Sequence, residues 1–428
     1  VSARLRKYTI VAGNSLTIPS FFKNRYRDHK NIIKIVSASI IAVFFTVYTA
    51  SAFSSGAKLF ATLFSDSASG DENYNRVYVI GLIVAAVVIL VYTFMGGFKA
   101  VCTTDLIQGL MMIVAILSVP VLAYATLTFD TGFSSALAAK GVEQPAQFLN
   151  FFVNGDGTPV SAVSIISNLA WGLGYFGMPH ILVRFMAVKS NEEIKKSRKI
   201  AVVWVIISLT ASCLIGLIAR GYLTAQLDDA TSESVFIRTI QQLFSGNGVL
   251  IFIGGIFLCG ILAAIMSTAD SQLLVTASAV SEDLYKGAVK KNASEKSSLL
   301  VGKIAVAVVA VIAFFIALNP KSSIMGLVSD AWAGFGSAFG PVVLLALFWK
   351  RSTLSGAISG MATGALTVII WDYIPLVNGQ TLYAATNLYS LVVGFGLALI
   401  VNVIVSLLSK KPSKEIMDEF DSIKNIEV

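Results

Sequence analysis

The stretch CGILAAIMSTADSQLLV, residues 259–275, places hydroxyls, a carboxylate and an amide inside an otherwise apolar segment. On a helix, Ser267 and Thr268 lie three and four residues after Ala264, on the same face as its carbonyl oxygen. Such hydroxyls commonly bond back to a carbonyl one turn earlier, which is a structural role. Three grouped oxygens are also suitable ligands for a dehydrated hard cation.

The composition indicates that this segment lies in a membrane. Of 428 residues, 56% are hydrophobic and 13% are charged, whereas an average soluble domain has about 25% charged residues. A spanning helix needs about 20 apolar residues, with about 17 as the lower limit. Ten stretches meet this requirement: residues 35–57, 77–98, 106–129, 157–183, 200–219, 239–269, 304–320, 331–349, 352–371 and 373–409.

A carboxylate inside a span changes how the opening segment is interpreted. Asp270 and Gln272 directly follow the two hydroxyls. Ionisable residues within membrane spans normally face a polar pathway or pair with a partner. The group as a whole therefore favours a binding site over helix packing.

Charges between the ten stretches predict the orientation of the chain. Basic residues gather before the first stretch and after the fourth, sixth, eighth and tenth, whereas the boundaries after the first, third and fifth stretches are mainly acidic. This is the positive-inside pattern, so both ends are expected in the cytoplasm. It also explains the net charge of +8, so nucleic-acid binding is not predicted. The three cysteines do not have the spacing of metal ligands: Cys102, Cys213 and Cys259.

The fourth stretch contains a second unusual segment, SNLAWGLGYFGMPHILVRFM. Three glycines and a proline fall between Gly172 and Pro179, so the helix is expected to break there. Discontinuous helices mark transporter binding sites, although a glycine-rich packing face with a proline kink is the alternative. On a helical path Trp171 and Tyr175 share a face and present two aromatic walls. His180 is interpreted as a hydrogen-bonded packing residue.

Four motifs resemble those of the sodium/solute symporter family, most closely its bacterial proline-transporting branch. They are WGLGYFGMPHILVRFMA (171–187), AAIMSTADSQLLV (263–275), EDLYK (282–286) and VSDAWAGFGSAFGPVVLLALFW (328–349). The resemblance implies an all-α polytopic membrane helix bundle with a LeuT-like five-plus-five inverted repeat and extra helices. It further implies a transporter rather than an enzyme, in a bacterial inner membrane, that imports L-proline with sodium as coupling ion by alternating access.

The resemblance also assigns residues to ligands. The sodium site is expected to comprise the hydroxyls of Ser267 and Thr268 with the carbonyl of Ala264. Asp270 has no carboxylate counterpart in the best-known proline symporters, so a second sodium and a structural hydrogen bond both remain open. The proline site is expected to include two aromatic residues, a third in VYTFMGGF and a functionally sensitive glutamine: Trp171, Tyr175, Tyr92 and Gln272.

The resemblance implies a longer protein. Family members have thirteen spans, so three are expected to precede VSARLRKYTI and to complete the sodium and substrate sites. Residues 1–428 alone would then hold half a site and would not accumulate proline. Residues 1–411 are predicted to form the transmembrane domain. Residues 412–428 are predicted to form a cytoplasmic tail, with Ile416, Phe420 and Ile423 on one face of a short amphipathic helix.

Two alternatives remain for the function. The same fold could carry another small solute, such as pantothenate, a monocarboxylate or another amino acid. A membrane sensor or structural subunit with a vestigial site is the other alternative, which the absence of a signalling domain in this sequence disfavours. No obligate protein partner is predicted. Sodium-dependent uptake of labelled solutes would separate these alternatives.

Overall fold

The computed structural model describes residues 1–65, 71–95, 98–130, 132–154, 157–229, 231–290, 292–319 and 323–423. Within these ranges, nine helices are long and apolar enough to cross a membrane. They are α3 (Ile32–Phe64), α4 (Glu72–Met95), α5 (Phe98–Asp130), α10 (Asn191–Tyr222), α12 (Gly248–Ser278), α13 (Glu295–Ala317), α14 (Ile324–Phe348), α15 (Leu354–Tyr373) and α17 (Ser390–Leu408). The polytopic all-α bundle predicted from the sequence is confirmed.

The fourth predicted span is interrupted where its glycines and proline indicated. It consists of α8 (Ala162–Gly174) and α9 (Pro179–Ala187), and neither is long enough to span alone. Pro179 is the first residue of α9, where its missing N–H costs no helical hydrogen bond. Met178 before it is extended, as expected for a residue that precedes proline.

Two predicted boundaries are wrong. The stretch 239–269 divides into α11 (Val235–Leu243) and α12, which continues past Ala269 into the π-helix η2 (Ala279–Val289). Asp270 and Gln272 therefore lie inside a long helix instead of at its end. The stretch 373–409 begins with a hairpin of β1 (Pro375–Val377) and β2 (Gln380–Thr381), and only α17 spans. Positive φ angles of 50° at Asn378 and 76° at Gly379 fit a tight two-residue hairpin turn.

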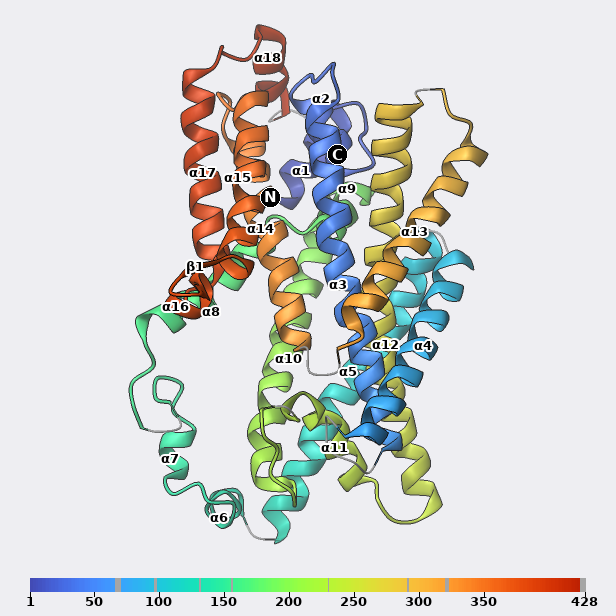
Figure 1. The fold of residues 1–428 in the computed structure, drawn as a ribbon, viewed down its shortest axis with the longest axis vertical. Coiled ribbons are helices and arrows are strands. Elements are labelled where there is room, and N and C mark those ends of the chain that lie inside the picture. The colour runs from blue at the N-terminus through green and yellow to red at the C-terminus, as the bar shows by residue number, and fades with distance from the viewer. Residues whose placement is uncertain are drawn as a thin grey trace.

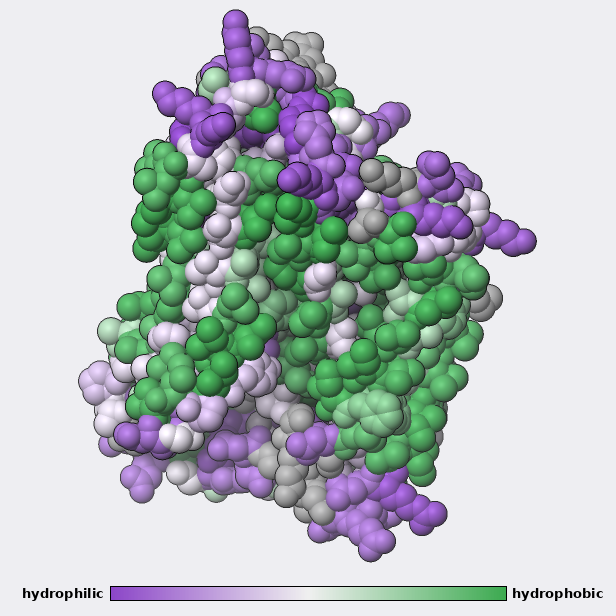
Figure 2. Space-filling view, turned by 45° about the horizontal axis from the view of Figure 1, so that its top comes forward, coloured by the Kyte–Doolittle hydropathy of each residue, from purple (hydrophilic) through white to green (hydrophobic). Residues whose placement is uncertain are grey.

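Short helices complete the fold. They are α1 (Ser2–Val11), α2 (Ile18–Arg25), α6 (Phe133–Ala139), α7 (Pro145–Phe148), η1 (Ser232–Ser234), α16 (Leu382–Thr386) and α18 (Lys414–Ser422). In Figure 1, α1, α2 and α18 lie toward one end of the bundle, and α6, α7 and α11 lie toward the other. Figure 2 shows an apolar belt between two polar ends, which is the surface of a multi-pass membrane protein.

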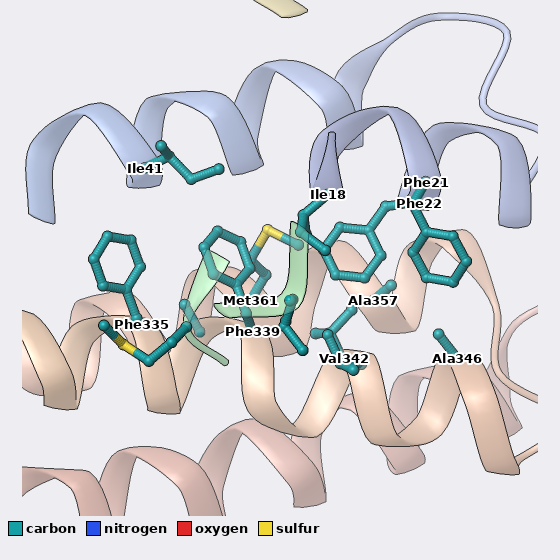
Figure 3. Packing of buried hydrophobic residues seen from close by; sticks show 14 of the residues in the cluster. Ile18, Phe21, Phe22, Ile41, Phe335, Phe339, Val342, Ala346, Ala357 and Met361 are labelled. Atoms are coloured by element: carbon teal, nitrogen blue, oxygen red, sulfur yellow. The ribbon is translucent and has the colours of Figure 1, made fainter. Parts of the chain in front are cut away.

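Helix α14 forms the centre of the packing. Every residue of it from Ala331 to Val343 is buried, and it packs against α15, α17, α3 and α8. In Figure 3, Phe335 and Phe339 on α14 face Ile41 on α3 and the aromatic residues of α2. The close approach of α15 to α14 depends on glycine, because a Cβ at Gly364 of α15 would lie 2.2 Å from the backbone oxygen of Ser337 on α14.

The predicted amphipathic tail helix is present as α18, and its apolar face packs on the protein. Phe420 and Ile423 are buried, and the Phe420 ring lies under the guanidinium groups of Arg4 and Arg25, at 4.9 Å and 5.4 Å. An ion pair of 2.5 Å joins Arg27 to Glu419. Helix α18 is therefore docked on α1 and α2. The last residues of the predicted tail, 424–428, lie outside the described residues.

We expect Phe420→Ala to release α18. A helix of nine residues is marginal by itself, and loss of a buried phenylalanine costs about 3–5 kcal/mol in a protein core. Limited trypsinolysis of the purified protein should then cleave faster at Lys410, Lys411 and Lys414. Asp418→Ala, at an exposed position of the same helix, is the control and should cleave like the wild type. Unchanged cleavage of Phe420→Ala would contradict the anchoring role.

Candidate functional site

The two predicted hydroxyls of α12 and the Ala264 carbonyl form a close group. Ser267 Oγ donates to the carbonyl oxygen of Ala264 at 3.1 Å, and Thr268 Oγ1 donates to the same oxygen at 2.9 Å. All three residues are half-buried. Each hydroxyl oxygen keeps lone pairs that can face a cation while its proton is donated. The observed bonds are those of the back-bonded role, and a cation site at these oxygens stays a prediction.

Asp270 and Gln272, on the same helix, are completely buried. Neither carboxylate oxygen of Asp270 meets hydrogen-bond geometry with a partner in the described part of the chain, and the same holds for Gln272 Nε2. Thr49 on α3 donates to Gln272 Oε1 at a long 3.4 Å. Buried polar groups are nearly always paired with hydrogen-bond partners. The poor pairing of these atoms therefore indicates that this section of α12 has a functional role in addition to helix packing.

An ion pair next to Asp270 was not anticipated from the sequence. Arg184 on α9 lies 2.5 Å from Asp105 on α5, and its Nη2 also donates to Ser271 Oγ on α12 at 2.8 Å. The pair thus ties the second half of the broken span to two continuous helices. Each of the two residues stands one position outside a predicted span, which is why hydropathy assigned both to loop flanks.

A cavity of 520 Å³ opens beside this ion pair toward the end that carries α1 and α2. His180 and Arg184 of α9 line one side, and Ser271 and Asp283 line the other. Asp283, in η2, accepts hydrogen bonds from Thr17 at 3.0 Å and Ser20 at 2.9 Å and lies 3.0 Å from Lys34 Nζ. The cavity walls belong to α1, α2, α3, α5, α9 and α12 with its π-helical extension.

The predicted aromatic pair meets around Trp332 of α14. The Trp332 ring centroid lies 5.6 Å from that of Trp171 and 4.9 Å from that of Tyr175, the latter edge-on. Tyr389, from the N-cap of α17, stacks on Trp171 at 5.7 Å. These four rings form the aromatic cluster. Trp332 and Tyr389 were missed by sequence reasoning, since aromatic residues in apolar helices carry no local signal of function.

The third predicted aromatic residue, Tyr92, lies away from the aromatic cluster and interacts instead with Asp270 and Asp105. It belongs to α4, which packs on α3, α12 and α13, and α4 and α8 occupy opposite sides of the bundle in Figure 1. Tyr48 of α3 is nearer to the cluster. Its ring lies 6.4 Å from that of His180, and its hydroxyl is close enough to Tyr175 for electrostatic interaction.

Comparison with known proteins gives the family. The sequence model of the Sodium:solute symporter family (SSF) matches residues 2–364. The chain belongs to the sodium:solute symporter family. Sodium/proline symporters of Staphylococcus aureus and of its strain JH9 are each 42% identical over 434 residues, which covers 100% of this chain and 79% of each relative.

A solved structure supports the fold independently. A substrate-bound, outward-open Na⁺-coupled sialic acid symporter superposes with a TM-score of 0.69 at 18% identity, covering 96% of this chain and 84% of that one. The LeuT-like transporter fold expected from the resemblance is thereby confirmed. Sodium is the coupling ion of this family, and the symporter is a multi-pass membrane protein.

At the end opposite the cavity, Glu233 of η1 connects two helices of the symporter. Its carboxylate accepts hydrogen bonds from the Ile324 amide at 2.8 Å and from the Met325 amide at 3.3 Å, at the first turn of α14. It also lies 2.5 Å from Lys58 of α3. Anionic groups are stabilised at helix N-termini. Burial raises the pKa of Glu233, but the Lys58 ammonium and these hydrogen bonds lower it more, so its pKa is below the usual value.

We expect this connection to weaken in acid. Because the pKa of Glu233 is lower in the folded state, its stabilisation is complete above the unfolded-state value and is lost as the pH falls through the folded-state value. Thermal stability of the purified symporter should therefore fall between about pH 5 and pH 3, and Glu233→Gln should flatten that part of the curve. Glu415→Gln, on the exposed side of α18, is the matched control. An unchanged pH curve in Glu233→Gln would contradict this role.

Proposed function

We propose that this symporter imports L-proline together with Na⁺ by alternating access. The observation that carries the proposal is the 42% identity, over the whole chain, to relatives named sodium/proline symporters. The aromatic cluster supports it, because proline has an apolar ring that aromatic walls can contact. Sodium-dependent uptake of labelled L-proline by the reconstituted full-length transporter tests it, since residues 1–428 alone are expected to hold half a site. Uptake of another solute in preference to proline would contradict the substrate.

The proposal includes a location in a bacterial cell membrane with both chain ends in the cytoplasm. The basic loops support this orientation, since those around Lys350 and Arg27 meet α18 at the same end of the bundle. The cavity opens at that end. In this orientation the cavity faces the cytoplasm, and Glu233 joins α3 to α14 on the outer side.

Ala264, Ser267 and Thr268 are proposed as sodium ligands. Their grouped oxygens support the assignment, because a hard cation requires several oxygen donors. Asp270 is buried two residues further on, beside Tyr92 and Ser271, and both a second sodium and a structural hydrogen bond remain open for its carboxylate.

Trp171 and Tyr175 are proposed to contact proline, and Gln272 is proposed as a further residue of the proline site. Contacts with Trp332 hold the two rings at the break of the span, and discontinuous helices form the substrate sites of transporters of this kind. For the third aromatic position, Tyr48 is better placed than Tyr92, because it lies beside His180 and Tyr175.

Replacing Thr268 by Val should raise the sodium concentration for half-maximal uptake about tenfold or more, since loss of a group at a metal site typically costs 10–100-fold in affinity. Thr276→Val is a matched control, because Thr276 makes the same back-bond on α12, to Gln272 O at 2.8 Å. It should leave the sodium dependence within about twofold. Equal effects of the two variants would assign Thr268 to helix packing.

Replacing Trp171 by Ala should weaken proline binding roughly tenfold, because an aromatic contact is worth about 0.5–1.5 kcal/mol beyond the area it buries. Sodium binding should remain nearly unchanged. Proline-dependent and sodium-dependent uptake curves measure the two effects separately. Trp204→Ala on α10, where the indole packs near Gly109 of α5, controls for loss of a tryptophan. Unchanged proline affinity in Trp171→Ala would reassign Trp171 to packing.

A further inference from the structure

The break in the fourth span leaves carbonyl groups that require hydrogen bonds. In a continuous helix the amide of Tyr175 would bond to the carbonyl of Trp171. Here it bonds to Leu173 O instead, and the amide of Gly177 bonds to Gly174 O. The carbonyl of Trp171 therefore loses its helical donor at the point where the proposed substrate site begins.

Trp332 replaces that donor. Its indole Nε1–H donates to the carbonyl oxygen of Trp171 at 2.9 Å. The indole itself is only 7% exposed and belongs to the most buried section of α14. An unpaired carbonyl away from water is costly, so this bond fixes the end of α8 against α14.

The fit around Trp332 is close on both sides of the hydrogen bond. A Cβ at Gly174 would lie 1.9 Å from Trp332 Nε1, and one at Gly177 would lie 2.3 Å from Phe335 O. The last turn of α8 and the residues that follow it thus pack directly on the backbone and indole of α14. The same indole contacts the rings of Trp171 and Tyr175.

We infer that Trp332 is a positioning residue that sets the spacing of Trp171 and Tyr175 and thereby the ring size that the site accepts. This inference rests on the proposed function. Without the N–H, the free carbonyl of Trp171 would seek another donor and the end of α8 would shift. The aromatic walls would then no longer match a five-membered ring.

Trp332→Phe tests the inference, because it keeps an aromatic ring and removes the donor. The measured quantity is uptake of L-proline relative to azetidine-2-carboxylate and pipecolate, which differ from it by one ring methylene. One methylene is worth about 10–200-fold in selectivity in a well-fitted apolar pocket. We expect the variant to lose at least about tenfold of any such preference for proline.

Trp371→Phe is the matched control. It also keeps an aromatic ring and removes an indole N–H, which on α15 donates to the carbonyl oxygen of Leu388 at 2.9 Å and not to α8. Its selectivity should match the wild type. The ratio of two substrates does not depend on the amount of folded protein, so a merely structural loss leaves it unchanged.

The outcomes distinguish an error in the proposed function from an error in the role of Trp332. If the full-length protein, with the spans expected before residue 1, fails to transport proline with sodium, the proposed function is wrong. If the wild type transports proline and Trp332→Phe keeps its selectivity among ring sizes, the positioning role alone is wrong. Equal loss of selectivity in Trp332→Phe and Trp371→Phe would also overturn it, because the effect would then not depend on the bond to Trp171.

Discussion

A backbone break inside a membrane requires substitute hydrogen bonds, and the arrangement of this bundle depends on that constraint. Between Gly174 and Pro179 the chain leaves the helical path at a depth where water cannot serve every freed group. Helix α14 meets the requirement with an indole donor and close backbone packing. Its buried section in turn lies against α3, α15 and α17, so the geometry of the break is transmitted to most of the core.

Much of the architecture follows from the sequence for simple physical reasons. Hydropathy alone locates the spans because a hydrocarbon layer accepts few polar side chains, and glycines with a proline locate the break. The spacing of Ala264, Ser267 and Thr268 predicts their grouping because side chains three and four residues apart share a helix face. The observed hydrogen bonds confirm that geometry.

Other features depend on contacts between distant segments. The predicted end of α12 was wrong because two polar residues, Asp270 and Gln272, indicated the end of an apolar span. In the structure the helix continues through both residues, and packing against other helices buries them. The pairing of Asp105 with Arg184, 79 residues apart, has no local pattern. Trp332 is likewise distinguished from the other buried residues of α14 only by the carbonyl that it meets on α8.

Helix α3 has a mechanical property that follows from its two lysines. Lys34 pairs with Asp283 near the cavity, and Lys58 pairs with Glu233 at the opposite end. The 24 residues that separate them span about 36 Å at 1.5 Å per residue, which exceeds the hydrocarbon thickness of about 30 Å. The helix is therefore long enough to cross the membrane and has one ion pair near each end. If the helix tilts about its middle as a rigid body, its two charged attachments move in opposite directions, so a shift at one ion pair requires a shift at the other.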